Sequence, residues 1–327
     1  MSKEQVGVDG PRWASAGLVL RGFGLYYPEE QIFNSDVAAV PGNSIDASVL
    51  GTVSVRSRHR SSETETVQFM AAEAGKAAVK DAGLEPTELD LLVLSNWTTP
   101  PFTPEYGPEV AALLGTPRTL AFDISGACVG FLHGVQTAAA YLHCVPEARH
   151  ALVVCSEQFS RRVRPGSKGE LVASDAAGAV VLSKSTEKSG LIDVVLHSDG
   201  SRADVIRVAA PRGWIRSEST LPDHAVTSIV DSCAEVFRRT GVTMDEVDWV
   251  VPHPGTDVVH RRVRTALEVP EEKFIVNFET RGNTSSASIP IVLAEQIAAG
   301  RFRPGDLVLS PAIGAGWYSG AMLYRIH

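Results

Sequence analysis

The sequence predicts an α/β protein built by internal duplication, and three observations support that fold class. Hydrophobic strands alternate with helical patterns along most of the 327 residues, which is typical of sheets covered by helices on both faces. Residues 83–97 are repeated in residues 241–255 as a helix-ending glycine, a short acidic connector and a buried strand. The ends of the two halves also match, because residues 174–182 parallel residues 316–324.

The expected elements follow one order in both halves. A helix precedes each repeat, and the first of these helices is expected to be capped near Ser61 and Ser62. A short helix, a strand, a small-residue turn and a second helix follow each repeat. The expected ranges are helix 64–82, helix 106–114, strand 119–124 and a helix after residue 128 in the first half, then helix 222–240, helix 258–267, strand 273–278, helix 289–299 and strand 306–310 in the second.

Composition restricts the function classes. A hydrophobic content of 44% and a charged content of 21% are those of an ordinary globular protein, and a net charge of −8 argues against nucleic-acid binding. The chain has no apolar run of the roughly 20 residues that span a bilayer and no apolar signal segment, so we expect a cytoplasmic protein without a membrane partner. The expected organisation is a disordered tail (1–16), a first half (17–185) and a second half (186–327).

Cys128 is the candidate nucleophile. It lies at a turn between the expected strand 119–124 and the helix that follows. The unpaired N–H groups and the positive dipole end of a helix stabilise a thiolate at such a place. The alternative is a buried structural cysteine, since free cysteines are often buried. The four cysteines show no Cys-x-x-Cys pairing, so no metal site is expected.

His253 and Asn283 are the second-half partners that the duplication suggests. Asn283 occupies the turn equivalent to that of Cys128, and His253 directly follows a strand. Duplication therefore predicts that the three loop residues meet at one site. Cys128 can attack a thioester there, and both partners can donate hydrogen bonds to a thioester oxygen that becomes an enolate. The alternatives are that His253 is a core histidine and that Asn283 only caps a helix.

A small-residue loop at 314–317 completes the candidate site. The backbone N–H near Ala315 and that of Cys128 would form an oxyanion hole for the acylation step. The alternative is a tight turn without a catalytic role.

These residues and motifs resemble the thiolase superfamily, specifically β-ketoacyl-acyl-carrier-protein synthase III and its relatives. The resemblance extends from about Gly22 to the C-terminus. It is carried by Arg56-Ser-Arg-His, the Ala-Cys-Val-Gly-Phe turn at Cys128, Leu196-His-Ser-Asp-Gly, Val250-Val-Pro-His, Gly282-Asn-Thr-Ser-Ser-Ala-Ser-Ile-Pro and Arg303-Pro-Gly-Asp-Leu-Val-Leu.

The resemblance implies a thiolase-like, five-layered αβαβα duplication that is usually a homodimer. It implies that Cys128 is the acylated nucleophile and that His253 and Asn283 activate the second substrate. It also implies that the loop 99–106 crosses to the site of the partner subunit.

The departures from the family pattern suggest a specialised member. Pro254-Gly-Thr-Asp replaces Gln-Ala-Asn after the histidine, and Ser174-Asp-Ala-Ala-Gly-Ala replaces Gly-Asp-Gly-Ala-Gly-Ala. The tryptophan that stacks on coenzyme A adenine is absent near Ser48, and its arginine partner is Lys168. An aromatic platform is worth up to about 3 kcal/mol to a stacked base. Its loss argues against coenzyme A-primed fatty-acid initiation and favours a carrier-bound donor in polyketide or other secondary metabolism.

No bound cofactor is expected, because acyl and malonyl groups would arrive on acyl carrier protein or coenzyme A. The candidate contacts to a phosphopantetheine phosphate are Lys168, Arg212 and Arg216, with a solvated surface charge as the alternative for each. The candidate pocket aromatics are Trp97, Phe102, Trp214, Phe278 and Trp317, each of which could instead belong to the core.

Three functions remain open at this point. The first is decarboxylative condensation of an acyl group with a malonyl-type thioester, which the complete Cys-His-Asn set favours. The second is acyl transfer from Cys128 to a hydroxyl, an amine or a carrier thiol, with His253 as general base. The third is a non-catalytic subunit that binds acyl groups, which retention of all three residues argues against.

Overall fold

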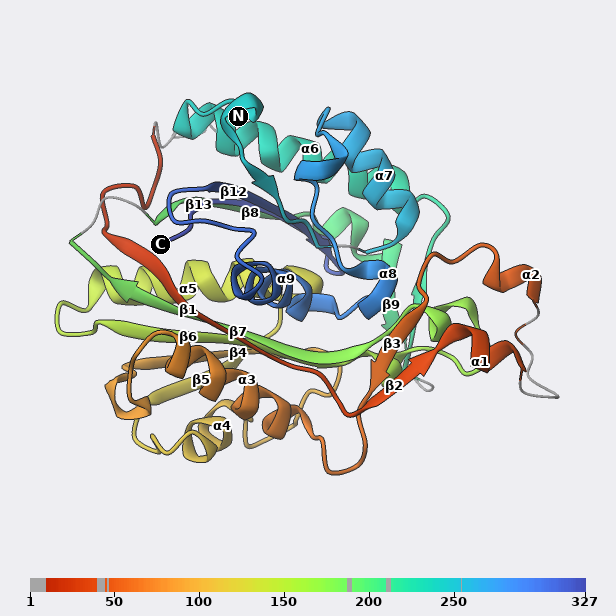
Figure 1. Cartoon of the computed structure of the whole chain (residues 1–327), viewed down its shortest axis with the longest axis horizontal. Coiled ribbons are helices and arrows are strands. Elements are labelled where there is room, and N and C mark those ends of the chain that lie inside the picture. The colour runs from red at the N-terminus through yellow and green to blue at the C-terminus, as the bar shows by residue number, and fades with distance from the viewer. Residues whose placement is uncertain (1–9, 40–44, 46, 187–189, 210–212, 254) are drawn as a thin grey trace.

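The computed structural model describes residues 10–39, 45, 47–186, 190–209, 213–253 and 255–327. Its two main sheets alternate with helices, so that five layers follow one another as helix, sheet, helix, sheet and helix (Figure 1). The expected five-layered αβαβα fold is thereby confirmed. The central layer consists of α5 (Gly130–Cys144) and α9 (Ser288–Ala298), one from each half of the chain.

The two sheets come from separate stretches of the chain. The first sheet has the order β1 (Leu18–Tyr26), β7 (Asp175–Lys184), β6 (His150–Gln158), β4 (Leu91–Ser95) and β5 (Leu120–Ile124). The second has the order β11 (Trp249–Val250), β12 (Leu307–Gly314), β13 (Tyr318–Arg325) and β8 (Leu191–Ser198). Two antiparallel strand pairs stand apart, β2 (Glu30–Phe33) with β3 (Ser57–Arg60) and β9 (Ile206–Ala209) with β10 (Trp214–Ser217).

The outer helices cover the far faces of the sheets. On the first sheet these are α3 (Val67–Asp81) and α4 (Gly107–Leu113), and on the second α6 (Leu221–Thr240) with α7 (Asp257–Ala266) beside it. The remaining helices are short: α1 (Asn34–Ala39), α2 (Ala47–Leu50) and α8 (Phe278–Arg281). All five residues of β4 are buried, as expected for a strand covered on both faces.

The strand directions repeat between the sheets. In the first sheet β4 runs parallel to β6, which pairs with β7 in antiparallel fashion, and β7 pairs likewise with β1. The second sheet has the same succession: β11 runs parallel to β12, β12 pairs with β13 in antiparallel fashion, and β13 pairs likewise with β8. The duplication seen in the sequence is therefore a duplication of the fold.

The expected strand 273–278 is wrong. At the place equivalent to β5, only Phe274 pairs with Val250, in a single parallel bridge. The reason is that β11 ends before Pro252, which has no N–H to donate to a ladder. With nothing to pair beyond that point, the chain turns into α8.

Two further expectations change near the N-terminus. Thr66, rather than Ser61 or Ser62, caps α3 by accepting a hydrogen bond from the Phe69 N–H, because the Ser61 hydroxyl donates to the buried Asp175 carboxylate instead.

The expected disordered tail 1–16 contains an ordered part. Trp13 is 8% exposed and packs in the core, with its indole N–H donating to Gln136 at 2.9 Å. Residues 1–9 lie outside the described residues.

None of the helices within the described ranges is long and apolar enough to cross a membrane.

Candidate active site

Cys128 lies between the two sheets, at the start of the central helix α5. It belongs to the 3₁₀ turn Ala127–Val129, which connects β5 to α5, and Ala127 adopts a left-handed φ of 46°. The Cys128 residue is half-buried and lines a cavity of about 1000 Å³. The sequence placed it at a strand-to-helix turn, and the structure agrees.

Asn283 reaches the same cavity from the equivalent turn of the second half. Its backbone is tied to the first half, since its N–H donates to the Val172 carbonyl at 2.8 Å and its carbonyl accepts from Ser174 at 3.0 Å. Its side-chain Oδ1 accepts the Ser285 N–H at 2.8 Å, and Nδ2 donates to the Gly255 carbonyl at 2.9 Å. The amide orientation is thus fixed, and Nδ2 keeps a second hydrogen for a ligand.

His253 is the third residue at the cavity and is 3% exposed. In the free protein burial lowers its pKa to about 3, so that the ring is neutral before a substrate binds. Its Nδ1 lies 3.2 Å from the Ser288 Oγ, and that hydroxyl donates its only hydrogen to the Ser285 carbonyl at 2.7 Å. The Ser288 oxygen therefore accepts from Nδ1–H, which leaves Nε2 unprotonated and able to act as a base.

The Cys128 thiol is protonated in this arrangement. Burial raises its pKa to about 12, while a contact with Ser285 lowers it and the nearby Glu157 raises it. The helix start alone therefore does not produce the thiolate that the sequence suggested. A thiol that shares its cavity with a neutral imidazole can instead pass its proton to the ring as the sulfur attacks.

The loop at 314–317 lies against the Cys128 backbone. A Cβ atom on Gly314 would come within 2.9 Å of the Cys128 backbone nitrogen, so a side chain there would crowd that N–H. Ala315 lines the cavity at the same place, between β12 and β13. The geometry is compatible with the oxyanion hole predicted from Cys128 and Ala315.

Comparison of the sequence with known proteins identifies the family of this chain. The family model of 3-oxoacyl-[acyl-carrier-protein] synthase III matches residues 122–200, and that of its C-terminal part matches residues 237–326. β-Ketoacyl-[acyl-carrier-protein] synthase III of Aquifex aeolicus is 34% identical over 311 residues, which cover 94% of this chain and 99% of that protein.

The chain belongs to this synthase III family.

Solved structures agree with that assignment. The Aquifex aeolicus synthase III structure superposes with a TM-score of 0.89, covering 94% of this chain and 100% of that one. The priming β-ketosynthase from the R1128 polyketide biosynthetic pathway is 26% identical, with a TM-score of 0.88, and covers 98% of each chain. The chain is therefore a ketosynthase III-type condensing enzyme of the acyl-transferring class.

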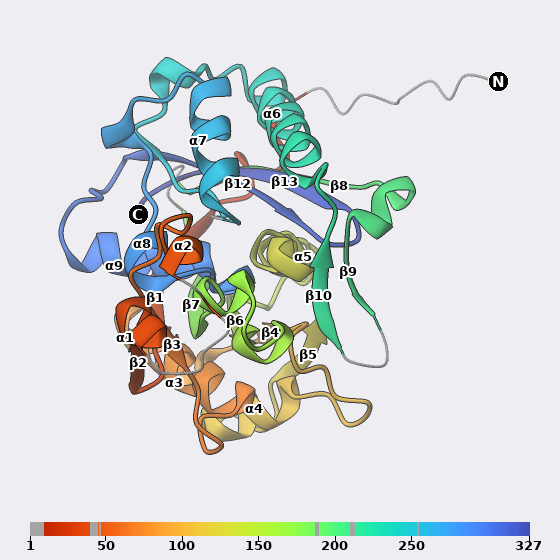
Figure 2. The ribbon, with the colours of Figure 1, turned by 90° about the vertical axis from the view of Figure 1, so that its right-hand side faces the viewer.

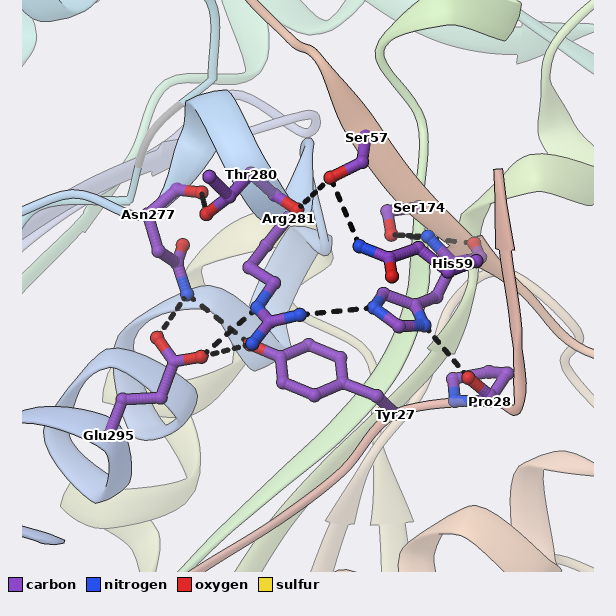
Figure 3. A network of polar contacts seen from close by, with 10 residues as sticks. Tyr27, Pro28, Ser57, His59, Ser174, Asn277, Thr280, Arg281 and Glu295 are labelled. Carbon is purple, nitrogen blue, oxygen red and sulfur yellow. Dashed lines mark hydrogen bonds and ion pairs between the residues drawn. The ribbon is translucent and has the colours of Figure 1, made fainter. Parts of the chain in front are cut away.

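A polar network supports the loop that carries Asn283 in this synthase III member (Figure 3). Arg281 contacts the Glu295 carboxylate at 3.2 Å and lies over the Tyr27 ring at 4.3 Å. The His59 Nδ1–H donates to the Pro28 carbonyl at 2.8 Å, so its Nε2 accepts from Arg281 at 3.2 Å. The Arg56-Ser-Arg-His motif of the first half thus anchors the loop that carries Asn283 in the second.

The other predicted site residues divide into three groups. Lys168, Arg216, Trp97 and Trp214 line the cavity, and two of them belong to β10 of the β9–β10 hairpin (Figure 2). Phe278, Trp317 and Phe102 do not line it, so these three expectations are wrong within this chain. Arg212 lies outside the described residues.

Physical reasons explain these corrections. Trp317 lies in the turn before β13, where its buried indole N–H donates to the Ser228 hydroxyl of α6 at 2.9 Å, whereas the next residue, Tyr318, lines the cavity. Phe278 is buried against the His260 ring. Phe102 is fully exposed to solvent.

Sequence reasoning missed two polar residues beneath the site. Ser285 contacts the Cys128 sulfur, and Glu157 is fully buried at the end of β6, where it accepts hydrogen bonds from Ser286 at 2.6 Å and Thr98 at 2.8 Å. The sequence could have identified Glu157, because a charged residue at the end of an apolar strand is unusual. It could not have identified Ser285, because a serine-rich segment is also typical of a helix cap.

Proposed function

We propose that the protein acylates Cys128 from an acyl thioester and then condenses that acyl group with a malonyl-type thioester. The observation that carries the proposal is the convergence of Cys128, His253 and Asn283 on one cavity from three loops. Each has the chemistry that its step requires: a nucleophile, an unprotonated imidazole nitrogen and a fixed amide donor.

In the first step His253 Nε2 accepts the Cys128 proton as the sulfur attacks the donor carbonyl. The N–H groups of Cys128 and Ala315 hold the oxyanion, and the tetrahedral intermediate collapses to a thioester on Cys128. The donor thiolate leaves and takes a proton from solvent, so the ring keeps its proton on Nε2.

In the second step the malonyl-type thioester loses carbon dioxide. The electron pair of the broken C–C bond forms an enolate, whose oxygen accepts hydrogen bonds from Asn283 Nδ2 and from His253 Nε2–H. The enolate carbon attacks the acyl carbonyl on Cys128. The sulfur leaves, recovers its proton from His253, and the β-ketoacyl product departs.

Intact-protein mass spectrometry with acyl-carrier and acyl-coenzyme A donors tests the proposal. Wild type is expected to gain one acyl mass that Cys128→Ala lacks, while Cys144→Ser, which changes an exposed cysteine near the end of α5, is expected to keep it. Addition of malonyl-carrier is expected to discharge the adduct as a β-ketoacyl product with release of carbon dioxide. An adduct that malonyl-carrier leaves intact would refute condensation.

Acyl transfer without decarboxylation is the second candidate. The unprotonated Nε2 of His253 favours it, because that atom can deprotonate a hydroxyl, an amine or a carrier thiol. In the same experiment such acceptors, and not malonyl-carrier, would then clear the acyl adduct.

We further propose that the donor is carried by an acyl carrier protein and serves polyketide or other secondary metabolism. Lys168 and Arg216 at the cavity provide cations for a phosphopantetheine phosphate. The missing adenine-stacking tryptophan near Ser48 and the likeness to a polyketide priming ketosynthase support a specialised role. Faster acylation from coenzyme A than from carrier donors would contradict it.

We propose that the protein is a homodimer because of two features of the first half. Within the described residues β5 pairs only with β4, so its other edge is free, and Phe102 projects fully into solvent. A second copy would cover this edge and accept the Phe102 ring. Sedimentation is expected to show a dimer that Phe102→Ser weakens, and a monomeric wild type would refute it.

A further inference from the structure

The Cys128 sulfur has a hydrogen-bond partner that the mechanism above leaves unused. The Ser285 Oγ lies 3.3 Å from Sγ, and the Ser285 residue is completely buried. The same oxygen accepts the indole N–H of Trp97 at 2.7 Å. Three residues from different parts of the chain therefore form a line that ends on the nucleophile.

The hydrogens that each group carries decide which atom donates in these two hydrogen bonds. An indole nitrogen is only a donor, so the Ser285 oxygen accepts from Trp97. The hydroxyl has one hydrogen, and the sulfur is the partner that remains for it. A thiolate only accepts, so loss of the Cys128 proton fixes the order as Trp97 N–H to Ser285 O–H to sulfur.

Ser285 and Trp97 are both held in place by other contacts. The Ser285 backbone N–H donates to Asn283, and its carbonyl accepts from Ser288. The Trp97 ring packs edge-on against Phe159, with 5.5 Å between ring centroids. The hydroxyl is therefore preorganised toward sulfur before any substrate binds.

We propose that Ser285 is a catalytic residue that donates its hydroxyl hydrogen to the Cys128 thiolate, and that Trp97 is the positioning residue that orients this hydroxyl. The proposal rests on the proposed role of Cys128 as nucleophile. A donor is needed here, because burial opposes ionisation of the sulfur and a bond to the charged form favours it.

The rate of Cys128 alkylation by iodoacetamide as a function of pH tests this proposal without substrate. Tandem mass spectrometry of the peptides assigns the label to Cys128 and separates it from the other three cysteines, including Cys144 on the same tryptic peptide. Ser285→Ala is expected to lower the rate of Cys128 alkylation by about 10- to 100-fold at every pH below the thiol pKa, because loss of a hydrogen bond to a charged group raises that pKa by about one to two units. Alanine fits the backbone there, since Ala127 adopts the same left-handed φ at the equivalent turn.

Trp97→Phe keeps the aromatic packing and removes only the indole N–H. We expect a shift of the same sign and smaller size, and no further shift when it is added to Ser285→Ala. Trp249→Phe is the matched control, because it removes an equally short indole bond, 2.7 Å to Asp306, away from the cavity. That variant is expected to leave the profile unchanged.

An unchanged alkylation profile in Ser285→Ala would overturn the proposal, and so would additive shifts in the double variant. The outcome is separable from the proposed function. A shifted profile in a protein that forms no acyl adduct would keep the thiolate contact and refute the condensing role. An acyl adduct with unshifted alkylation profiles would keep Cys128 as the nucleophile and refute the thiolate contact with Ser285.

Discussion

Ala127 and Ser285 occupy the same position in the two halves of the protein. Each is the first residue of a 3₁₀ turn that leads into a central helix, and each has a left-handed φ, 46° and 56°. This backbone is unfavourable for residues other than glycine and is kept where the surroundings require it. Here it turns Cys128 and the Ser285 hydroxyl toward each other across the junction of the halves.

Gly314→Ala is expected to lower the rate of Cys128 acylation by about 10²–10³-fold. The new methyl group would lie 2.9 Å from the Cys128 backbone nitrogen and would displace an oxyanion. Single-turnover acylation followed by mass spectrometry measures the effect. Gly200→Ala is the control, because a Cβ there meets no atom within 4 Å. Equal rates in both variants would exclude this N–H from the oxyanion hole.

Asn283→Ala is expected to lose up to about 10-fold in acylation, because it also removes the acceptor of the Ser285 N–H, and to lose about 10²–10³-fold in decarboxylation of malonyl-carrier. The reason is that its Nδ2 donor serves the enolate and not the first step. Radiolabelled carbon dioxide release measures the second step separately. Asn277→Ala, which removes an amide donor to Glu295 in the supporting network, is the control. A matching loss in the acylation step would refute this division of roles.

Glu157→Gln is expected to make protein stability less dependent on pH. Burial raises the pKa of the Glu157 carboxyl to about 7, so the folded protein binds this proton more tightly than the unfolded chain does. Its stabilising contribution is complete below pH 4.5 and is lost as the pH rises to about 7.

The free energy of unfolding of Glu157→Gln should therefore improve relative to wild type between pH 4.5 and 7.5, by up to about 3 kcal/mol. Urea titrations at the two pH values measure it. Glu63→Gln, which changes an exposed glutamate, is expected to show no such trend. A constant difference for Glu157→Gln would contradict the prediction.

Arg281→Met is expected to lower the free energy of unfolding by about 1–3 kcal/mol. It leaves the Glu295 carboxylate, whose side chain is 21% exposed, without its cation, and it removes the donor to His59. Urea denaturation gives the value. Arg264→Met removes the surface ion pair with Glu271 and should cost about 0–1 kcal/mol. The network would have no special role if the two losses were equal.

Sequence periodicity predicted the main elements of the fold because each depends on local patterns. Helix α6 was expected at 222–240 and is found at Leu221–Thr240, and the strand expected at 119–124 is found at Leu120–Ile124. The strand expected at 273–278 failed because its pairing depends on where β11 ends, which is a property of a neighbour distant in sequence.

By itself, the sequence determined the α/β class, the duplication and the turn positions of Cys128, His253 and Asn283. These follow from hydrophobic period and from residue types placed after strands. Only the tertiary structure decided that Trp317 faces α6, that Glu157 lies buried beneath the site, and that Trp97 reaches the Ser285 hydroxyl. The physical reason is that a side chain's direction and partners are set by packing between distant segments, which no local pattern in the chain encodes.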